Sequence, residues 1–414
     1  MDKFQSGFRT NHSTTTALLK VTDDIRMGMD VKEATIMVLF DFSKAFDKVH
    51  HSLLLAKLRL LGLSNNVLTF IGSYLEDRQQ CVKDPNGKVS SWLTVETGVP
   101  QGSVLGPLLY CLYVNDICRV FKNNHNVLKY HLYADDLVMY ASSPTEQLHN
   151  IIENVNDAIK NLCIYSSQHN LSLNAEKTQL IIVGYTKILK NINYEALPPI
   201  ILNDHNLKYS NCVKYLGVQI NSTLTWNEHI DTIIKKVFSA MHSLKRNSYC
   251  LPRDLRILLV SALVMPILDY ASCVYDDLYE ILNIRLQRLQ NACIRFIFDF
   301  RRDAHVTEFY LQLGWLKLKE RRMLNNMILL RKILKCQTPK YLFNEFKLLS
   351  EVHGRRNRFT NKLLQIPIHR TVKCADSFKI KACKLYNNFE MSKLSGVNDQ
   401  KFKQTLRARL LSGY

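Results

Sequence analysis

Residues 127–141 of this chain read VLKYHLYADDLVMYA. Two β-prone runs, Val127–Tyr133 and Leu137–Ala141, are separated by only three residues, Ala-Asp-Asp. Strands that are joined so tightly form an antiparallel hairpin. The sequence therefore predicts a hairpin whose tip carries two adjacent carboxylates, Asp135 and Asp136.

A third carboxylate, Asp41, ends the apolar run Thr35–Phe40, which is short enough to be a buried strand. Side chains of Asp crowded together cost free energy unless a cation lies among them. Magnesium prefers oxygen ligands, and two such ions can clamp the attacking and leaving oxygens of phosphoryl transfer. Asp41, Asp135 and Asp136 are thus a candidate metal site. Taken alone, a pair such as Asp135–Asp136 more often simply fills a solvated turn.

Helical and extended patterns alternate through the first 230 residues, and this order predicts an α+β sheet domain. From about His229 onward the spacing of Leu and Ile is mainly helical. The expected helices lie at residues 13–27, 52–61 (ending at Gly62), from Pro107 onward and 150–167, the expected strands at 180–183 and 213–220, and a hairpin turn at Asp84–Gly87.

The charge of the chain is concentrated near its C-terminus. The chain has 414 residues, 47% of them hydrophobic, which is enough for two or three structural units. Its 55 Lys and Arg against 36 Asp and Glu give +19, and residues 301–414 contribute 25 against 8, or +17. That excess is more than solubility requires and favours a segment that grips a phosphate backbone. A solvated helix face is the alternative.

The basic residues of this region are interleaved with aromatic residues, a combination suited to nucleic acid. The basic groups are Arg301-Arg302, Arg321-Arg322, Arg331-Lys332 and Arg355-Arg356-Asn357-Arg358, and the aromatic residues are Phe309, Tyr310, Trp315 and Phe359.

Cysteine usage and hydropathy indicate an intracellular protein. The eleven Cys form no CxxC pair, so reduced and mostly buried thiols are expected. The apolar stretch Ile257–Leu268 is too short to cross a membrane, and no cleavable signal precedes the first motif. We therefore expect no membrane association and a location in the nucleus, the cytoplasm or both. Because a motif begins only a few residues after Met1, an N-terminally truncated chain is also expected.

Six segments occur in the order found in one family of enzymes. The chain resembles the reverse transcriptases of non-LTR (LINE-like, jockey-type) retrotransposons. Each segment alone is a weak signal, but six in order over residues 5–229 make the resemblance specific. They are QSGFR with HST (residues 5–9 and 12–14), FDFSKAFDKV (40–49), GVPQGSVLGP (98–107), YADD (133–136), LSLNAEKT (171–178), and YLGV (215–218) with Trp226 and His229.

The resemblance implies a right-hand polymerase fold with a palm sheet, partial fingers, a helical thumb and a helical basic C-terminal region. The expected boundaries are fingers and palm at residues 1–230, a thumb-like helical region at 231–300 and the basic helical region at 301–414. No endonuclease domain, further fingers sequence or zinc knuckle is recognisable in the chain.

Carried over residue by residue, the resemblance makes Asp41 and Asp135 the principal metal ligands, completed by Asp136. The cofactor it implies is two Mg²⁺ ions, with Mn²⁺ as an alternative. Lys177 resembles the lysine that protonates the pyrophosphate leaving group, although a solvated lysine is the ordinary interpretation.

The same resemblance implies a nucleotide-binding set. Arg9 would meet the incoming triphosphate, or else be a surface arginine. Phe46 would block a ribose 2'-hydroxyl, or else be a core aromatic residue. Gln101 and Gly102 would lie against the nucleotide sugar and template base, or else form a plain turn.

The function implied is that of an RNA-directed DNA polymerase. It would add dNTPs to a DNA primer 3'-hydroxyl on an RNA template by two-metal phosphoryl transfer. One alternative is a truncated, catalytically inactive remnant that binds nucleic acid. Another is a maturase of the group II intron type, although no nuclease segment follows the thumb region.

Overall fold

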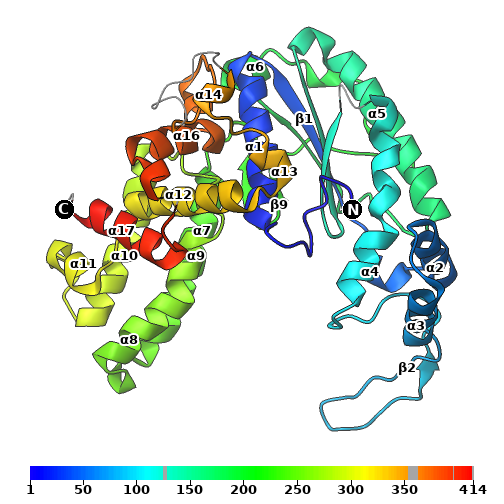
Figure 1. Ribbon diagram of the computed structural model, residues 1–414, viewed down its shortest axis with the longest axis horizontal. Coiled ribbons are helices and arrows are strands. Elements are labelled where there is room, and N and C mark those ends of the chain that lie inside the picture. The colour runs from blue at the N-terminus through cyan, green and yellow to red at the C-terminus, as the bar shows by residue number, and fades with distance from the viewer. Residues whose placement is uncertain (125–127, 353–361, 395, 413–414) are drawn as a thin grey trace. The chain divides into compact units, whose positions relative to one another are not determined.

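A computed structural model describes residues 1–124, 128–352, 362–394 and 396–412 (Figure 1). The chain forms two compact units that are interleaved in sequence. Unit 1 comprises residues 1–13, 35–182 and 190–210, and unit 2 comprises residues 14–34, 183–189 and 211–414.

Unit 1 is built on a four-stranded sheet with the strand order β4-β5-β1-β6. The strand β1, next to β5, is buried along its whole length. The bounds are β1 Ala34–Phe40, β4 Lys129–Tyr133, β5 Asp136–Ser143 and β6 Gln179–Val183. Strands β4 and β5 pair antiparallel with Tyr133 opposite Asp136, so the predicted hairpin is confirmed. Val127, which was expected to open it, lies outside the described residues.

Helices and two smaller hairpins complete unit 1, and helix α5 packs against β5 through an apolar face with a spacing of three and four residues. Gly62, just past helix α2, has φ +83°, as a helix stop requires. Figure 1 shows the hairpin β2–β3 extending away from α3. The bounds are α2 His51–Leu60, α3 Asn65–Leu75, β2 Gln79–Gln80, β3 Leu93–Thr94, α4 Gly106–Tyr113, α5 Leu148–Gln168, β7 Ile201–Leu202 and β8 His205–Asn206, with 3-10 turns at 45–48, 115–124, 145–147 and 194–196.

Unit 2 is mainly helical, as the sequence predicts. Its elements are α1 Thr14–Asp30, α6 Thr186–Leu189, β9 Cys212–Tyr215, β10 Val218–Asn221, α7 Asn227–Arg246, α8 Arg253–Leu259, α9 Met265–Asp269, α10 Glu280–Phe298, α11 Thr307–Leu313, α12 Leu318–Cys336, α13 Lys340–Phe343, α14 Leu349–Val352, α15 Val372–Ala375, α16 Phe378–Asn388 and α17 Asp399–Leu411, with 3-10 turns at 248–250 and 391–394 and a π-helical turn at 260–264.

The prediction of one strand over residues 213–220 is wrong. The segment is an antiparallel hairpin, β9–β10, in which Tyr215 pairs with Val218. Leu216 and Gly217 form its turn with φ values of +43° and +80°. Two consecutive left-handed residues are what a tight hairpin turn demands, and only Gly217 signals it in the sequence.

A buried ionic network organises unit 2. Arg26 of α1 is 1% exposed and pairs with Asp23 at 3.1 Å and with Asp277 at 3.0 Å. Asp277 also accepts a hydrogen bond from Trp226 Nε1 at 2.6 Å and pairs with Lys373 at 2.6 Å. Burial opposes ionisation of Asp277, but the charges of Arg26 and Lys373 lower its pKa. Arg26 Nε has no hydrogen-bond partner among the described residues, but the ion pairs of this buried network favour one arrangement of the helices that contribute to it.

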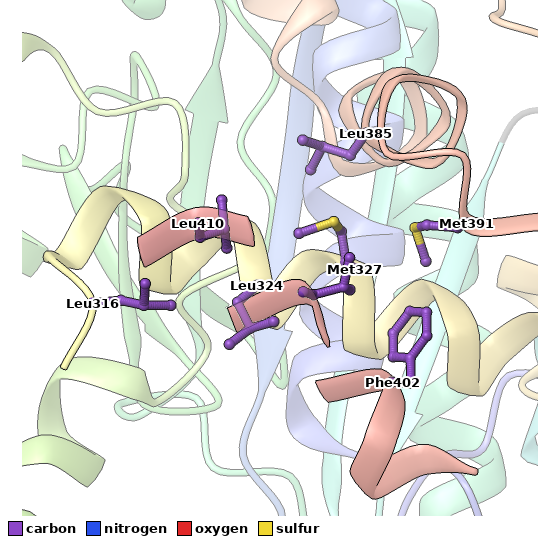
Figure 2. Close-up of a cluster of buried hydrophobic side chains, with 8 residues drawn as sticks. Leu316, Leu324, Met327, Leu385, Met391, Phe402 and Leu410 are labelled. Atoms are coloured by element: carbon purple, nitrogen blue, oxygen red, sulfur yellow. The ribbon is translucent and has the colours of Figure 1, made fainter. Parts of the chain in front are cut away.

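A separate apolar cluster joins α12, α16 and α17 of unit 2. Figure 2 shows its side chains converging between these helices. Leu406 and Met327 are fully buried at its centre, and Phe402 is 1% exposed. Burying large apolar side chains of this kind stabilises a fold by roughly 1.5–3 kcal/mol each.

His229 makes unit 2 sensitive to acid. The imidazole is buried beside Tyr275, and its Nδ1 accepts a hydrogen bond from the backbone N–H of Gln219 at 3.4 Å. Burial lowers the pKa of His229 to about 4. The unfolded chain binds a proton near pH 6.5 and the folded one does not, so this stabilisation is complete above pH 6.5 and is lost as the pH falls towards 4.

We expect His229 to account for a loss of about 1.6 kcal/mol in unfolding free energy between pH 6.5 and 5. Urea denaturation followed by tryptophan fluorescence measures it. His229→Gln keeps an acceptor but cannot titrate, so it should flatten the pH dependence, whereas His242→Gln on the exposed face of α7 should leave it unchanged. A variant at His229 with the wild-type pH dependence would contradict the assignment.

All eleven cysteines are free thiols, as predicted, but only five of them are buried, so the expectation that most are buried is wrong. No helix in the described parts of the chain combines the length and the hydropathy needed to cross a membrane.

Candidate active site

The three predicted acids lie at one end of the central strands β1 and β5 of unit 1. Asp41 follows β1 directly, and Asp136 begins the neighbouring strand β5. At the other end of these strands, Thr35 Oγ1 and Ser142 Oγ are 2.8 Å apart. Because Asp41 and Asp136 interact at the first end, the two strands run antiparallel. From Thr35 and Ser142, six residues along β1 lead to Asp41 and six residues back along β5 lead to Asp136. The strand pairing therefore brings together acids that are 95 positions apart in sequence.

The acids interact electrostatically. Burial, followed by the charges of Asp135 and Asp41, raises the pKa of Asp136 to about 6, although much of the Asp136 surface remains exposed. Burial also raises the pKa of Asp135, against a backbone hydrogen bond that lowers it, and Asp41 raises it further. The site thus concentrates negative charge that its own residues do not neutralise.

The donor chemistry fits a hard divalent cation, since the site offers carboxylate oxygens in mutual repulsion. Among the residues that the structure describes, however, no group of three or more His, Cys, Asp or Glu side chains is arranged closely enough to hold an ion as it stands. The three carboxylates are near neighbours but not a closed ligand set.

The LSLNAEKT segment supports Asp41 from one side. The backbone N–H of Asn174 donates to the carbonyl of Asp41 at 2.9 Å, and that of Ser43 donates to Ser172 at 2.8 Å. Phe42 forms an antiparallel bridge with Leu173. Lys177 lies three residues after Asn174 in the same segment and is exposed, so its role as a proton donor stays a prediction.

The QSGFR segment holds the tip of the β4–β5 hairpin. Gln5 Oε1 accepts hydrogen bonds from the backbone N–H of Gly7 at 2.8 Å and of Ala134 at 3.1 Å. Ser6 donates from its backbone to Leu132 at 2.8 Å. A Cβ on Gly7 would lie 2.3 Å from the backbone nitrogen of Ala134, so only glycine fits against the tip. Sequence reasoning assigned no role to Gln5 or Gly7, although their motif was the signal.

Arg9 is tied to its own segment. Its Nη1 donates to the carbonyl oxygens of Asp2 at 2.7 Å and Gln5 at 2.8 Å. The guanidinium is half-buried, and its contact with a triphosphate stays a prediction.

Phe46 packs on an aromatic residue that sequence reasoning missed. Its ring stacks on Tyr110 with centroids 4.3 Å apart, and Phe8 meets it edge-on at 6.3 Å. Tyr110 is 1% exposed, and burial first, then the charges of Asp135 and other neighbours, raises its pKa well above the ordinary value. Tyr110 therefore links Phe46 to the acid cluster. In the sequence, Tyr110 could have been noticed only through its position in the apolar helix that follows the GVPQGS loop.

Gln101 and Gly102 occupy an exposed loop. Gln101 Nε2 donates to Asp47 Oδ1 at 2.9 Å. Gly102 has φ +80°, and a Cβ there would meet nothing within 4 Å, so its backbone conformation rather than crowding by the chain calls for glycine. Gly98, at the start of the loop, is crowded, because a Cβ would lie 2.8 Å from Asp47.

Much of the predicted basic C-terminal surface is engaged inside unit 2. Arg321 pairs with Asp269 at 2.5 Å, Arg322 with Asp276 at 3.0 Å and Arg331 with Asp399 at 2.9 Å. These arginines already have carboxylate partners, so they are poor candidates for the phosphate contacts predicted for them.

Two of the four aromatic residues predicted to stack on bases have no exposed ring face. Tyr310 and Trp315 are buried, at 1% and 7% exposed, and cannot offer a ring face to a base. The prediction is wrong for these two residues, because they fill the core of unit 2. Phe359 and the arginines of residues 355–358 lie outside the described residues.

The chain is similar in sequence to RNA-directed DNA polymerases of transposons. It is 30% identical over 229 residues to the probable RNA-directed DNA polymerase from transposon X-element of Drosophila melanogaster, covering 55% of this chain and 24% of the relative. For transposon BS of the same fly, identity is 30% over 302 residues, 71% of this chain and 32% of the relative. The RNA-directed DNA polymerase from mobile element jockey of Drosophila funebris is 30% identical over 280 residues, which cover 66% of this chain and 29% of the relative. The chain thus spans a quarter to a third of these proteins.

Solved structures of telomerases also align with the chain. An apo telomerase from Candida tropicalis matches with a TM-score of 0.40 and 14% identity over 80% of this chain and 56% of that one. A telomerase from Candida albicans was solved in complex with a TWJ fragment of telomeric RNA. It matches with a TM-score of 0.39 and 14% identity over 76% of this chain and 52% of that one.

The family model described as reverse transcriptase (RNA-dependent DNA polymerase) matches residues 1–220, which contain the whole acid-bearing sheet and all the predicted site residues. The predicted resemblance to jockey-type elements is confirmed by the named relatives. The chain belongs to the reverse transcriptase (RNA-dependent DNA polymerase) family.

Proposed function

We propose that this chain is an RNA-directed DNA polymerase of a non-LTR retrotransposon, which adds dNTPs to a DNA primer 3'-hydroxyl on an RNA template. The observation that carries the proposal is the antiparallel pairing of β1 with β5, which places Asp41 beside Asp135 and Asp136. Family membership supports the reaction class, and reverse transcriptases generally use divalent metal ions and work on an RNA template with a primer.

Asp41, Asp135 and Asp136 would hold two Mg²⁺ ions, or Mn²⁺ in their place. When bound, the ions supply the charge that stabilises the attacking and leaving oxygens of phosphoryl transfer. A bound cation would offset the electrostatic repulsion among the three carboxylates. Arg9 would bind the triphosphate, Gln101 and Gly102 would lie along the incoming nucleotide, and Lys177 would deliver a proton to the departing pyrophosphate.

We assign these parts to a right hand, with fingers and palm in residues 1–230, a thumb in 231–300 and a basic helical region in 301–414. The combination of a sheet with helices in unit 1 and the mainly helical content after residue 226 support this division.

Primer extension tests the proposal. Purified chain is incubated with an RNA template, an annealed DNA primer, dNTPs and Mg²⁺, and the expected result is a primer lengthened by templated nucleotides. Chelation of the metal with EDTA should stop extension. Salt-dependent retention of the template and primer without any extension, in either Mg²⁺ or Mn²⁺, would instead establish the second candidate, an inactive nucleic-acid-binding remnant.

Phe46 is expected to exclude ribonucleotides. Its half-buried ring, held between Tyr110 and Phe8, is positioned by stacking and cannot swing away freely. Phe46→Val should therefore raise the efficiency of rNTP incorporation relative to dNTP by about tenfold or more, since it removes a steric clash. Single-nucleotide incorporation kinetics measure the ratio. Phe70→Val, at an exposed phenylalanine of α3, is the matched control. An unchanged ratio in the Phe46 variant would refute this role.

A further inference from the structure

Unit 2 contains a groove of about 970 Å³ whose lining includes none of the residues assigned to the candidate active site. It is formed by helices α7 and α10 and by the segment that follows α10. Five of its thirteen lining residues are cationic and only one is acidic: Lys245, Arg285, Arg288, Arg295 and Arg302 against Asp299.

Some of these cations are held in place by the fold. Arg285 pairs with Asp231 at 2.6 Å, and Arg295 donates from Nε to the carbonyl of Ala304 at 3.0 Å. The one acid, Asp299, lies 3.7 Å from Arg256 of α8, so its charge is shared with a cation outside the groove. Lys245, Arg288 and Arg302 have no carboxylate partner in the described portion of the chain. The groove therefore has positive charge to spare for an anionic ligand.

The groove also exposes aromatic rings between these charges. Phe238 of α7 is 59% exposed and Phe300 is 37% exposed, and both line it. Cationic side chains alternating with accessible aromatic faces form a surface that binds phosphates and stacks bases at once. A duplex would present its phosphates but hide its base faces, leaving Phe238 without a partner.

We propose that this groove is a binding site for single-stranded nucleic acid, with Arg288, Arg302 and Lys245 contacting phosphates and Phe238 stacking on a base. The site lies wholly within unit 2, whereas the acid cluster lies in unit 1. Through this groove the chain would bind an unpaired strand, and this binding would not depend on nucleotide addition.

Fluorescence anisotropy of the full chain with a labelled oligouridine of about twelve nucleotides tests the proposal. The assay contains EDTA and no dNTP, so its result is independent of polymerase activity. Salt is varied between roughly 50 and 200 mM. The test variant is Arg288→Gln with Arg302→Gln, and the matched control is Lys235→Gln with Lys236→Gln, which removes two exposed lysines of α7 outside the groove.

The groove variant should bind at least about tenfold more weakly, and its slope of log affinity against log salt should fall by roughly 1.4, because each single-strand phosphate contact contributes about 0.7. The control should stay close to wild type. Phe238→Ala should weaken binding about tenfold at every salt concentration and keep the slope.

Circular dichroism of each variant establishes that it is folded, and cross-linking of a 4-thiouridine oligonucleotide to the wild-type chain gives a readout without mutation. Cross-links are expected in residues 234–248 or 285–302. Equal binding by the groove and control variants, or cross-links confined to other segments, would overturn the proposal. Duplex binding as tight as that of the single strand, or an unaffected Phe238→Ala variant, would overturn the single-strand assignment in favour of a general polyanion surface.

Discussion

Asp135→Asn is expected to reduce primer extension by about 10³-fold or more, equivalent to roughly 4 kcal/mol of transition-state stabilisation. Asp135 lies in the two-residue turn between β4 and β5, and its carboxylate is near Asp136 and Asp41. An amide keeps the size of the side chain but loses the negative charge that would bind a divalent cation. Single-turnover extension on an annealed RNA template and DNA primer measures the rate.

Asp157→Asn is the matched control, because Asp157 is an exposed aspartate of α5 in the same unit. It should leave the rate unchanged. Binding of the template–primer by the Asp135 variant should also remain near wild type, which separates a lost chemical step from a lost substrate. An Asp135→Asn chain that extends primers at a near-normal rate would refute the assignment of this carboxylate.

Gly7→Ala is expected to reduce extension at least about a hundredfold while leaving most of the fold intact. The new Cβ would lie 2.3 Å from the backbone nitrogen of Ala134, a distance that real Cβ atoms do not tolerate. Neither atom can rotate away, so the QSGFR segment or the hairpin tip must move, and with it Asp135 and Asp136. Displacing reacting groups by about 1 Å is enough for such a loss.

The control for this variant is Gly396→Ala, where the added Cβ would meet nothing within 4 Å. It should behave as wild type in both extension and thermal unfolding. If Gly7→Ala extends primers normally, the hairpin tip does not need the close packing described here, and Gly7 is no positioning residue. Gln5→Leu should reproduce part of the defect, since it removes the acceptor for the N–H groups of Gly7 and Ala134.

The sheet and its acids could be predicted because their signals are local. The apolar run Thr35–Phe40 ends in a charge, and the β4–β5 runs are separated by too few residues for anything but a hairpin. The β9–β10 hairpin was missed because Leu216 adopts a left-handed backbone conformation, which a leucine in the sequence does not predict. A turn can be predicted from the sequence where Gly or Asn occupies its left-handed positions, and not where another residue does.

Long-range partnerships could not be predicted. Arg321, Arg322 and Arg331 look like a phosphate-binding series in sequence, yet each has a carboxylate partner about 50 to 70 positions away. Spacing along a helix says which face a side chain occupies but not what that face meets. For the same reason the hydrogen bonds from Gln5 to the hairpin tip and the stacking of Tyr110 on Phe46 emerged only from the fold.

Iron-directed cleavage tests most directly whether the three acids share divalent cations. Fe²⁺ replaces Mg²⁺ on the full chain bound to a template–primer and a dNTP. Added hydrogen peroxide is reduced by the bound Fe²⁺ to hydroxide and a hydroxyl radical that cuts the nearest backbone, and ascorbate returns the Fe³⁺ to Fe²⁺. We predict cuts beside Asp41 and beside Asp135–Asp136 in the same sample, suppressed by excess Mg²⁺ and absent from Asp135→Asn. Cuts at only one of these segments, or cuts that persist in excess Mg²⁺, would contradict a shared metal site.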